Sequence, residues 1–257
     1  MALPRQTDTS GRDHYAAIYR DELAAEARWL QYGAADKVDS VAQLLAGQGI
    51  VPGRVLELGC GTGAVITECQ RRGLGQSFTA IDYSADAIAH LAAQSPGIEC
   101  FQADINAPDF RLDREFDVVI LSHVLEHLEE PERLLASLRE RIRFKYLVAE
   151  VPLEDLFFSR VKAQLRDRMR NTAGHVQFYT PQSFAQLLQS ARFRIVAERN
   201  YAPVLSLEAA EFVSRKDGLS APRTALKKLL NCHLPRLAGP VWRRYYYANQ
   251  AMLCVPD

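Results

Sequence analysis

The sequence Val55-Leu56-Glu57-Leu58-Gly59-Cys60-Gly61-Thr62-Gly63 sets a short apolar run directly before three glycines at alternate positions. The apolar run predicts a strand over 54–58, and the residues after the glycines predict a helix that ends near residue 72. Glycine permits a positive φ and lets the backbone approach a ligand closely because it has no Cβ. A strand, a glycine turn and a helix in this order are typical of a nucleotide-cofactor site at the carboxyl end of a parallel sheet.

The spacing of the glycines separates two classes of cofactor. Dinucleotide-binding loops have the pattern GxGxxG, whereas the loop here is GxGxG with Glu57 two residues before its first glycine. A carboxylate at this place suits a ligand that carries an amine better than one that carries phosphates. A nicotinamide-dependent oxidoreductase stays an alternative at this point.

Outward from this loop, apolar runs alternate with helical patterns. Further strands are predicted over 78–81, 98–102, 116–121, 146–151, 192–198 and 246–255. Helices are predicted over 12–32, 37–48, 85–93, 131–141 and 180–190. This alternation predicts an α/β fold in which helices cover both faces of a mostly parallel sheet. We expect a helical cap over 1–50, a cofactor-binding core over 51–201, a helical insertion over 202–244 and a final core strand over 245–257.

Composition excludes several classes of protein. The 257 residues are 48% hydrophobic and 24% charged, which is typical of a globular chain. Basic and acidic residues number 31 each and no RNA-binding motif is present, so we expect no nucleic-acid partner. The five cysteines lack CxxC spacing, which excludes a zinc ribbon and argues against a disulfide framework. We see no signal-peptide pattern and no apolar run of about 20 residues, and therefore expect a cytoplasmic protein.

Residues 57–63, Glu-Leu-Gly-Cys-Gly-Thr-Gly, resemble motif I of the class I S-adenosylmethionine (SAM)-dependent methyltransferases. Asp82 ends the second strand, at the position where an acidic residue of that family holds the ribose hydroxyls. Asp104 follows the third strand, at the position where that family contacts the adenine. The resemblance implies a Rossmann-like seven-stranded sheet with an antiparallel last strand, and SAM as cofactor. It implies a cofactor site formed by Glu57, Gly59, Cys60, Gly61, Gly63, Asp82, Tyr83, Asp104, Ile105, Ser122 and His123. Residues 148–155 and 174–184 are similar to a bacterial branch of small-molecule and glycan-modifying methyltransferases.

The acceptor decides which further residues the chemistry needs. The methyl group of SAM is already activated, so the protein mainly aligns the acceptor and excludes water. An alcohol acceptor also gains from a general base, and histidine is the usual one near neutral pH. We expect His175 to be the leading candidate, with His123 and Glu150 as further catalytic candidates. The sequence thus predicts methyl transfer to a hydroxyl of a small molecule such as a sugar, with an N-methyltransferase as the alternative.

Two remaining patterns bear on metals and on the acceptor. His123-Val-Leu-Glu-His127 matches the HxxEH zinc signature, but that motif needs a continuous helix and His123 follows a strand after one residue, so we expect no metal. The helical insertions at 153–174 and 202–244 should form a substrate cap. The second holds eight basic and three acidic residues. This surplus fits an anionic acceptor, contact with an anionic membrane surface or a solvated helix face, and these alternatives stay open.

Overall fold

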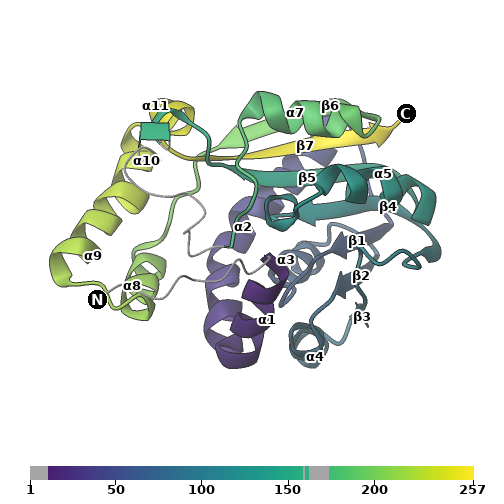
Figure 1. Cartoon of the computed structure of the whole chain (residues 1–257), viewed down its shortest axis with the longest axis horizontal. Coiled ribbons are helices and arrows are strands. Elements are labelled where there is room, and N and C mark those ends of the chain that lie inside the picture. Colours follow the sequence, from purple (N-terminus) through teal and green to yellow (C-terminus); the bar gives the residue numbers. More distant parts are fainter. Residues whose placement is uncertain (1–10, 159, 162–173) are drawn as a thin grey trace.

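A seven-stranded sheet in the order β3-β2-β1-β4-β5-β7-β6 forms the centre of the protein (Figure 1). The computed structural model describes residues 11–158, 160–161 and 174–257. Strand β7 lies antiparallel between β5 and β6, and the other strands run parallel to one another, which confirms the expected fold class. The strands are β1 Arg54–Leu58, β2 Ser77–Asp82, β3 Ile98–Gln102, β4 Leu112–Ser122, β5 Ile142–Leu153, β6 Phe193–Tyr201 and β7 Ala248–Pro256.

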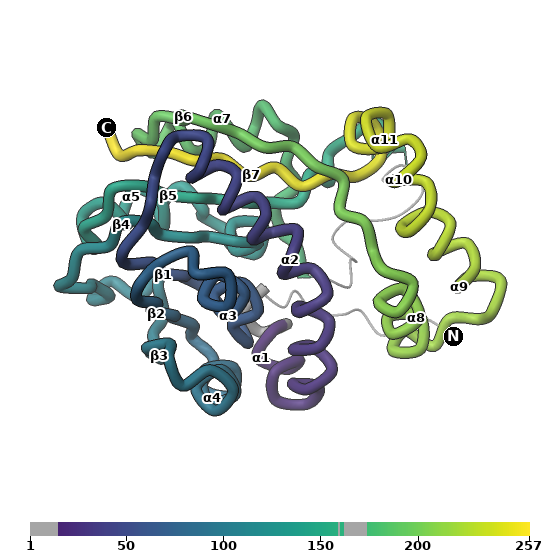
Figure 2. The backbone as a smooth tube through the Cα atoms, turned by 180° about the vertical axis from the view of Figure 1, so that it is seen from behind, coloured from purple at the N-terminus to yellow at the C-terminus, as the bar shows by residue number. Residues whose placement is uncertain are grey.

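Helices cover both faces of the sheet and close two apolar layers. One layer packs α5 and α7 against the sheet, and the other packs α2, α3 and α4 against the opposite face (Figures 1 and 2). Strand β4 supplies both layers, because Val119 and Leu121 face the first and Val118 and Ile120 face the second. The helices are α1 Gly11–Asp21, α2 Leu23–Gly47, α3 Ala64–Arg71, α4 Ala85–Gln94, α5 Pro131–Arg141 and α7 Pro181–Ser190.

Helix α2 differs from the sequence-based expectation. We predicted two helices with a break between residues 32 and 37, but the chain breaks at Glu22 and α2 then runs unbroken through Gly33. A glycine inside a helix is unfavourable by about 1 kcal/mol relative to alanine. Burial of Val38 and Val41 against the sheet offsets this loss. Tertiary packing therefore decides the length of the helix.

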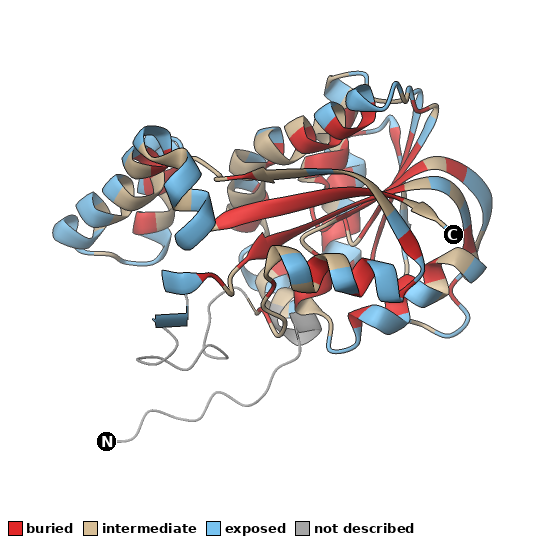
Figure 3. Ribbon diagram, turned by 90° about the horizontal axis from the view of Figure 1, so that it is seen from above, coloured by how far each residue is buried: buried red, intermediate tan, exposed pale blue. Residues whose placement is uncertain are grey.

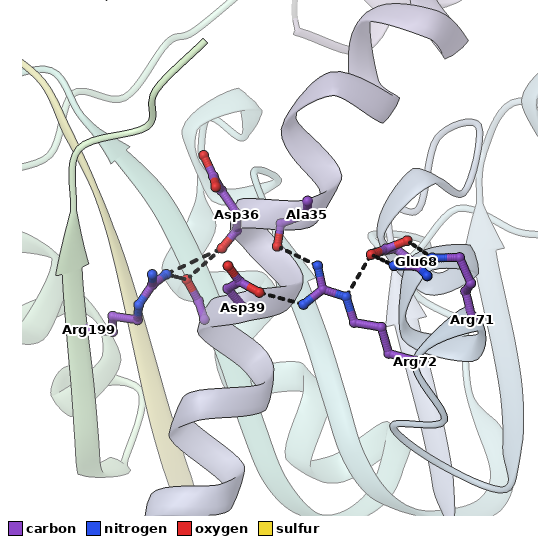
Figure 4. A network of polar contacts seen from close by, with 8 residues as sticks. Ala35, Asp36, Asp39, Glu68, Arg71, Arg72 and Arg199 are labelled. Carbon is purple, nitrogen blue, oxygen red and sulfur yellow. Dashed lines mark hydrogen bonds and ion pairs between the residues drawn. The ribbon is translucent and has the colours of Figure 1, made fainter. Parts of the chain in front are cut away.

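Two arginines join α2 to its neighbours (Figure 4). The Arg72 guanidinium, just after α3, donates to the Asp39 carboxylate at 2.5 Å and to Glu68 at 2.6 Å. From β6, Arg199 donates to the backbone carbonyl oxygen of Asp36 at 3.3 Å. The helix is thus held from both sides over its middle turns, and its N-terminal half projects past the sheet to form one wall of the functional site.

A helical lobe follows β6 and lies beside the projecting end of α2 (Figures 1 and 2). Salt bridges of 3.0 Å join Arg28 to Glu208 and Lys216 to Glu26, and so tie α8 to α2. Residues of this lobe are mostly exposed or half-buried, whereas those of the strands are mostly buried (Figure 3). The lobe consists of α8 Leu207–Lys216, α9 Ala221–Lys228, a π-helical turn Leu229–His233, α10 Leu234–Leu237 and α11 Gly239–Tyr245.

The structure tests two further expectations only in part, the helical insertion over 153–174 and the lack of a membrane-spanning segment. Most of the insertion predicted over 153–174 is not described. Among the described helices, none combines the length and apolar character that crossing a membrane requires.

The half-buried carboxylate of Asp117, in β4, gives a test of the fold. It accepts hydrogen bonds from the backbone N–H groups of Gly53 at 2.8 Å and Arg54 at 2.9 Å, and from the Lys145 ammonium at 2.7 Å. The Lys145 hydrogen bond, aided by the backbone donors, lowers the Asp117 pKa to about 2. We expect Asp117→Asn to lower the free energy of unfolding by about 1–2 kcal/mol at pH 7, measured by urea denaturation.

The stabilisation by Asp117 should depend on pH with a defined sign. The folded pKa lies below the unfolded value of about 3.9, so the stabilisation is present at neutral pH and is lost as the pH falls toward 2. The difference between wild type and Asp117→Asn should therefore narrow between pH 5 and pH 3. Asp113→Asn is the matched control, because this side chain is fully exposed and should shift stability by less than about 0.5 kcal/mol. A difference that is constant over this pH range would contradict the account.

Candidate active site

A cavity of about 1070 Å³ opens at the carboxyl ends of the parallel strands. Its wall comes from the glycine loop after β1, the loops after β2, β3 and β4, the inner faces of α1 and α2, and the helical lobe. Parallel α/β sheets bind ligands at this edge. The cavity exceeds the size that a typical single ligand needs, so it has room for a cofactor and a second molecule.

The glycine loop is fixed to the end of β2 by backbone hydrogen bonds. The N–H groups of Gly59 and Cys60 both donate to the carbonyl oxygen of Ile81, at 2.8 and 3.1 Å. The Asp82 carboxylate accepts from the Gly61 N–H at 2.8 Å and from the Ser84 N–H at 2.9 Å. Asp82 is only 4% exposed, and its burial raises its pKa. One carboxylate therefore joins the two loops that meet at the cavity floor.

Two glycines of this loop are required for different reasons. Gly61 has a φ of +52°, and a Cβ at this position would collide with the hydroxyl of Tyr19 on α1. Gly63 has a φ of +77°, and a Cβ there would overlap the side chain of Leu91 on α4. Gly61 thus allows α1 to close over the cavity, while Gly63 allows α3 to begin close to α4.

Glu57 and Cys60 lie in the same wall but differ in character. The Glu57 carboxylate is buried, and it accepts a hydrogen bond from the Ile66 N–H at 2.9 Å. Burial raises its pKa to about 8. Burial also raises the pKa of the Cys60 thiol, which therefore stays protonated near neutral pH and acts as a small packing residue.

Most of the site residues predicted from sequence lie in one wall. The cavity is lined by Glu57, Gly59, Cys60, Gly61, Asp82, Tyr83, Asp104, Ile105, Ser122, His123 and His175. Gly63 and Glu150 are outside this lining, because Gly63 begins α3 and Glu150 lies behind His123. The structure thus brings together residues from positions 57 to 175 of the sequence.

His123 follows β4 in an unusual backbone conformation. Its φ is +57°, a value uncommon for a residue other than glycine and often found at functional sites. Its N–H donates to the Glu150 carbonyl oxygen at 2.9 Å, which fixes the turn to β5. Its Nδ1 lies 3.2 Å from Oε1 of Glu126, and its Nε2 lies 3.4 Å from Oε1 of Glu150. The imidazole is therefore held between two carboxylates at the cavity wall.

Glu150, one of the catalytic candidates from sequence, is not among the residues that line the cavity. It is 3% exposed and accepts a hydrogen bond from the Tyr201 hydroxyl at 2.8 Å. That hydroxyl accepts in turn from Nδ2 of Asn249 at 3.0 Å. Strands β5, β6 and β7 thus supply a buried chain of polar groups that ends on His123, so Glu150 positions this histidine.

His175 lies on the same wall, after the part of the chain that is not described. Its Nδ1 is 2.5 Å from Oε2 of Glu154 at the end of β5. Burial opposes its protonation, but the hydrogen bond to Glu154 and the charge of Glu126 outweigh burial and raise its pKa. The Glu154 carboxylate therefore orients this histidine.

Sequence reasoning missed Glu126, the carboxylate at the centre of these histidines. It lies in the 3-10 helix Leu125–His127, is fully buried, and is surrounded by the imidazoles of His123, His127 and His175. Burial alone would raise its pKa, but these imidazoles lower it to about 2. The signal was present in HxxEH, which we assessed only as a continuous-helix motif.

Lys37 was also missed, since nothing in the pattern of α2 marks it. It lines the cavity, and burial there lowers the pKa of its ammonium group. Glu150, Glu126 and, to a smaller extent, Glu57 lie close enough for their charges to act on this group. The cavity wall thus carries an amine near several carboxyl groups.

Comparison with known proteins identifies the family. The family model described as a methyltransferase domain matches residues 26–198. The mitochondrial ubiquinone biosynthesis O-methyltransferase of Schizosaccharomyces pombe is 36% identical over 97 residues, which cover 35% of this chain and 34% of that protein. A probable S-adenosylmethionine-dependent methyltransferase of Mycobacterium tuberculosis is 35% identical over 92 residues, which cover 35% of this chain and 31% of that protein. The match thus spans about a third of the length of each of these relatives.

Solved structures show the same fold at low sequence identity. A Haemonchus contortus phosphoethanolamine N-methyltransferase, in complex with phosphomonomethylethanolamine and S-adenosylhomocysteine, has a TM-score of 0.66 at 12% identity, covering 97% of this chain and 60% of that one. The cyclase SpnF has a TM-score of 0.56 at 16% identity, covering 84% of this chain and 80% of that one. The family match removes the nicotinamide-dependent oxidoreductase alternative. Because it covers well over half of the chain, the protein belongs to the methyltransferase-domain family and is a class I S-adenosylmethionine-dependent methyltransferase.

Proposed function

We propose that this enzyme transfers the methyl group of SAM to a hydroxyl oxygen of a small molecule. The observation that carries the proposal is the placement of His123, whose imidazole faces the cavity while two buried carboxylates hold it. Similarity to ubiquinone biosynthesis O-methyltransferases gives weaker support for oxygen as the acceptor atom. An amine acceptor would need no such base.

The residues of the cavity floor fit SAM. The buried Asp82 carboxylate lies at the end of β2, where it can accept hydrogen bonds from a ribose diol. Tyr83, Asp104 and Ile105 would hold the adenine. Glu57 would pair with the amino group, and an ammonium ion beside it would lower its raised pKa. When bound, SAM supplies a methyl group on a positively charged sulfur.

His123 is the proposed general base. It would take the proton of the acceptor hydroxyl at an imidazole nitrogen after the ring turns from its present position, in which Nε2 is buried 3.4 Å from Glu150. The carboxylates of Glu126 and Glu150 would stabilise the imidazolium that forms. His175, the leading candidate from sequence, is more deeply buried, and its Nδ1 is already engaged with Glu154. We therefore place His175 in a supporting role in proton transfer.

The helical lobe supplies the wall on the acceptor side. The lobe contributes Val213 and Trp242 to the cavity lining beside polar residues, and the adjoining Leu205 and Tyr247 add further apolar and aromatic surface. The basic residues of the lobe that reach the cavity are paired, Lys216 with Glu26 and Lys227 with Asp217, each at 3.0 Å. These ion pairs reduce the positive electrostatic potential that the basic residues of the lobe create at the cavity. An acceptor with an apolar body and a hydroxyl group therefore fits this wall. An anionic acceptor stays a prediction.

Substitution of Asp82 tests the cofactor site. Asp82→Ala removes the proposed ribose contact and should weaken S-adenosylhomocysteine binding by about 1–3 kcal/mol, which is roughly 5- to 150-fold, in isothermal titration calorimetry. Asp86→Ala, an exposed change in the first turn of α4, is the control and should bind as wild type does. Since Asp82 also holds the Gly61 N–H, thermal unfolding of each variant must show that the fold is intact. Unchanged affinity in a folded Asp82→Ala protein would refute the assignment.

Substitution of His123 tests the reaction. Turnover would be followed as S-adenosylhomocysteine release across phenols, sugars and amines of similar size. We expect a hydroxyl compound to be methylated, and His123→Asn to lower kcat by about 10²–10⁴-fold while S-adenosylhomocysteine affinity changes less than threefold. His90→Asn on α4, outside the cavity lining, is the matched control. Selective methylation of amines, or full turnover by His123→Asn, would rule out the proposal.

A further inference from the structure

The side chain of Glu126 is the starting point of a second site. It is 0% exposed, and neither of its carboxylate oxygens has a hydrogen-bond partner among the described residues. An ionised carboxylate without hydrogen bonds in the protein interior is strongly unfavourable unless a cation compensates it. The 3-10 helix Leu125–His127 and the hydrogen bonds from the N–H groups of Val176 and Gln177 to the Glu126 carbonyl oxygen, at 2.8 and 3.0 Å, fix its backbone. The carboxylate is thus held in place.

Two imidazoles beside Glu126 are oriented as metal ligands are. His127 has its Nδ1 3.2 Å from the Gly174 carbonyl oxygen, so Nδ1 carries the proton and the Nε2 lone pair lies toward Glu126, 3.9 Å from Oε1. His175 has its Nδ1 2.5 Å from Glu154, and its ring lies 4.8 Å from that of His127. A hydrogen bond from one ring nitrogen to a carbonyl or carboxylate is the usual support of a metal-bound histidine.

We propose that Glu126, His127 and His175 bind one divalent transition-metal ion. One ligand atom from each residue lies within 4.8 Å of the others, so a small movement of the side chains closes the set around an ion. Two imidazoles and one carboxylate favour Zn²⁺, Mn²⁺ or Fe²⁺ over Mg²⁺ and Ca²⁺, which prefer oxygen ligands. The positive charge of the ion compensates the buried carboxylate.

The proposed site would replace the expectation that the chain holds no metal. The reason for rejecting a zinc-protease helix still applies, because residues 125–127 form a single 3-10 turn. The fold instead supplies the third ligand from His175, 48 positions after His127. Sequence spacing gives no sign of this pairing, which depends on the segment before α7 returning to the loop after β4.

The metal also has a role in the reaction, and this part of the inference rests on the proposed function. Three protein ligands leave coordination positions open, and both His127 and His175 line the cavity. A hydroxyl oxygen bound at an open position becomes more acidic. His123 lies beside Glu126 and would accept the proton of this hydroxyl. The site would thus select acceptors whose hydroxyl can bind a metal, such as phenols with adjacent hydroxyl groups.

Metal binding is tested on the full chain without SAM or acceptor. After removal of metals with a chelator, the protein is titrated with Co²⁺ as a spectroscopic probe and with Zn²⁺ in calorimetry. We expect one ion per chain and a Co²⁺ absorption spectrum that shows nitrogen ligands. Glu126→Gln and His175→Ala should each weaken binding more than 100-fold, and Glu154→Gln should weaken it 10- to 100-fold. His90→Ala is the control and should bind as wild type does.

The outcomes separate this inference from the proposed function. If the wild-type chain does not bind one metal ion per chain, the metal site is overturned, whether or not the variants fold. The proposal that the enzyme methylates a hydroxyl would be unaffected. Binding that persists in a folded Glu126→Gln protein also overturns it, because another group then holds the ion. Where the ion binds as expected, chelation should lower turnover at least tenfold and restoration of the ion should recover it. Full turnover by the metal-free enzyme would overturn the role of the ion in the reaction.

Discussion

Four carboxyl groups are buried at or just beyond the carboxyl ends of β1, β2, β4 and β5, and the site is organised by what compensates each of them. They belong to Glu57, Asp82, Glu126 and Glu150, and none is more than 4% exposed. Burial of charge is unfavourable unless hydrogen bonds or opposite charges compensate it. The start of α3 compensates Glu57, the two adjoining loops compensate Asp82, and Tyr201 compensates Glu150. Imidazoles surround Glu126, and the Lys37 ammonium lies near enough for the two charges to interact.

This distribution divides the cavity into two parts with different chemistry. Around Glu57 and Asp82, backbone N–H groups dominate, which suits a nucleoside and its amino-acid end. Around Glu126 and Glu150, side chains with exchangeable protons dominate, which suits the reacting oxygen. The helical lobe adds a wall of mixed apolar and polar residues.

The sequence predicted the parts of this arrangement that depend on local pattern. Three alternating glycines after an apolar strand, with Asp82 at the next strand end, were sufficient to predict that these residues lie together, because neighbouring parallel strands end at one edge. The length of α2 could not be predicted, since burial of Val38 and Val41 outweighs the effect of Gly33. The partnership of Glu126 with His175, and the position of Glu150 behind His123, depend on contacts between segments distant in sequence. Periodicity holds no information about such contacts.

A crystal structure with S-adenosylhomocysteine bound tests the central claim most directly, because it places the sulfur relative to the histidines. The account predicts that the ribose hydroxyls lie within hydrogen-bond distance of Asp82, about 2.7–3.2 Å, and that the sulfur faces the part of the cavity walled by His123. A ligand whose sulfur faces away from His123, with another polar group at the open side, would contradict the proposed site of methyl transfer.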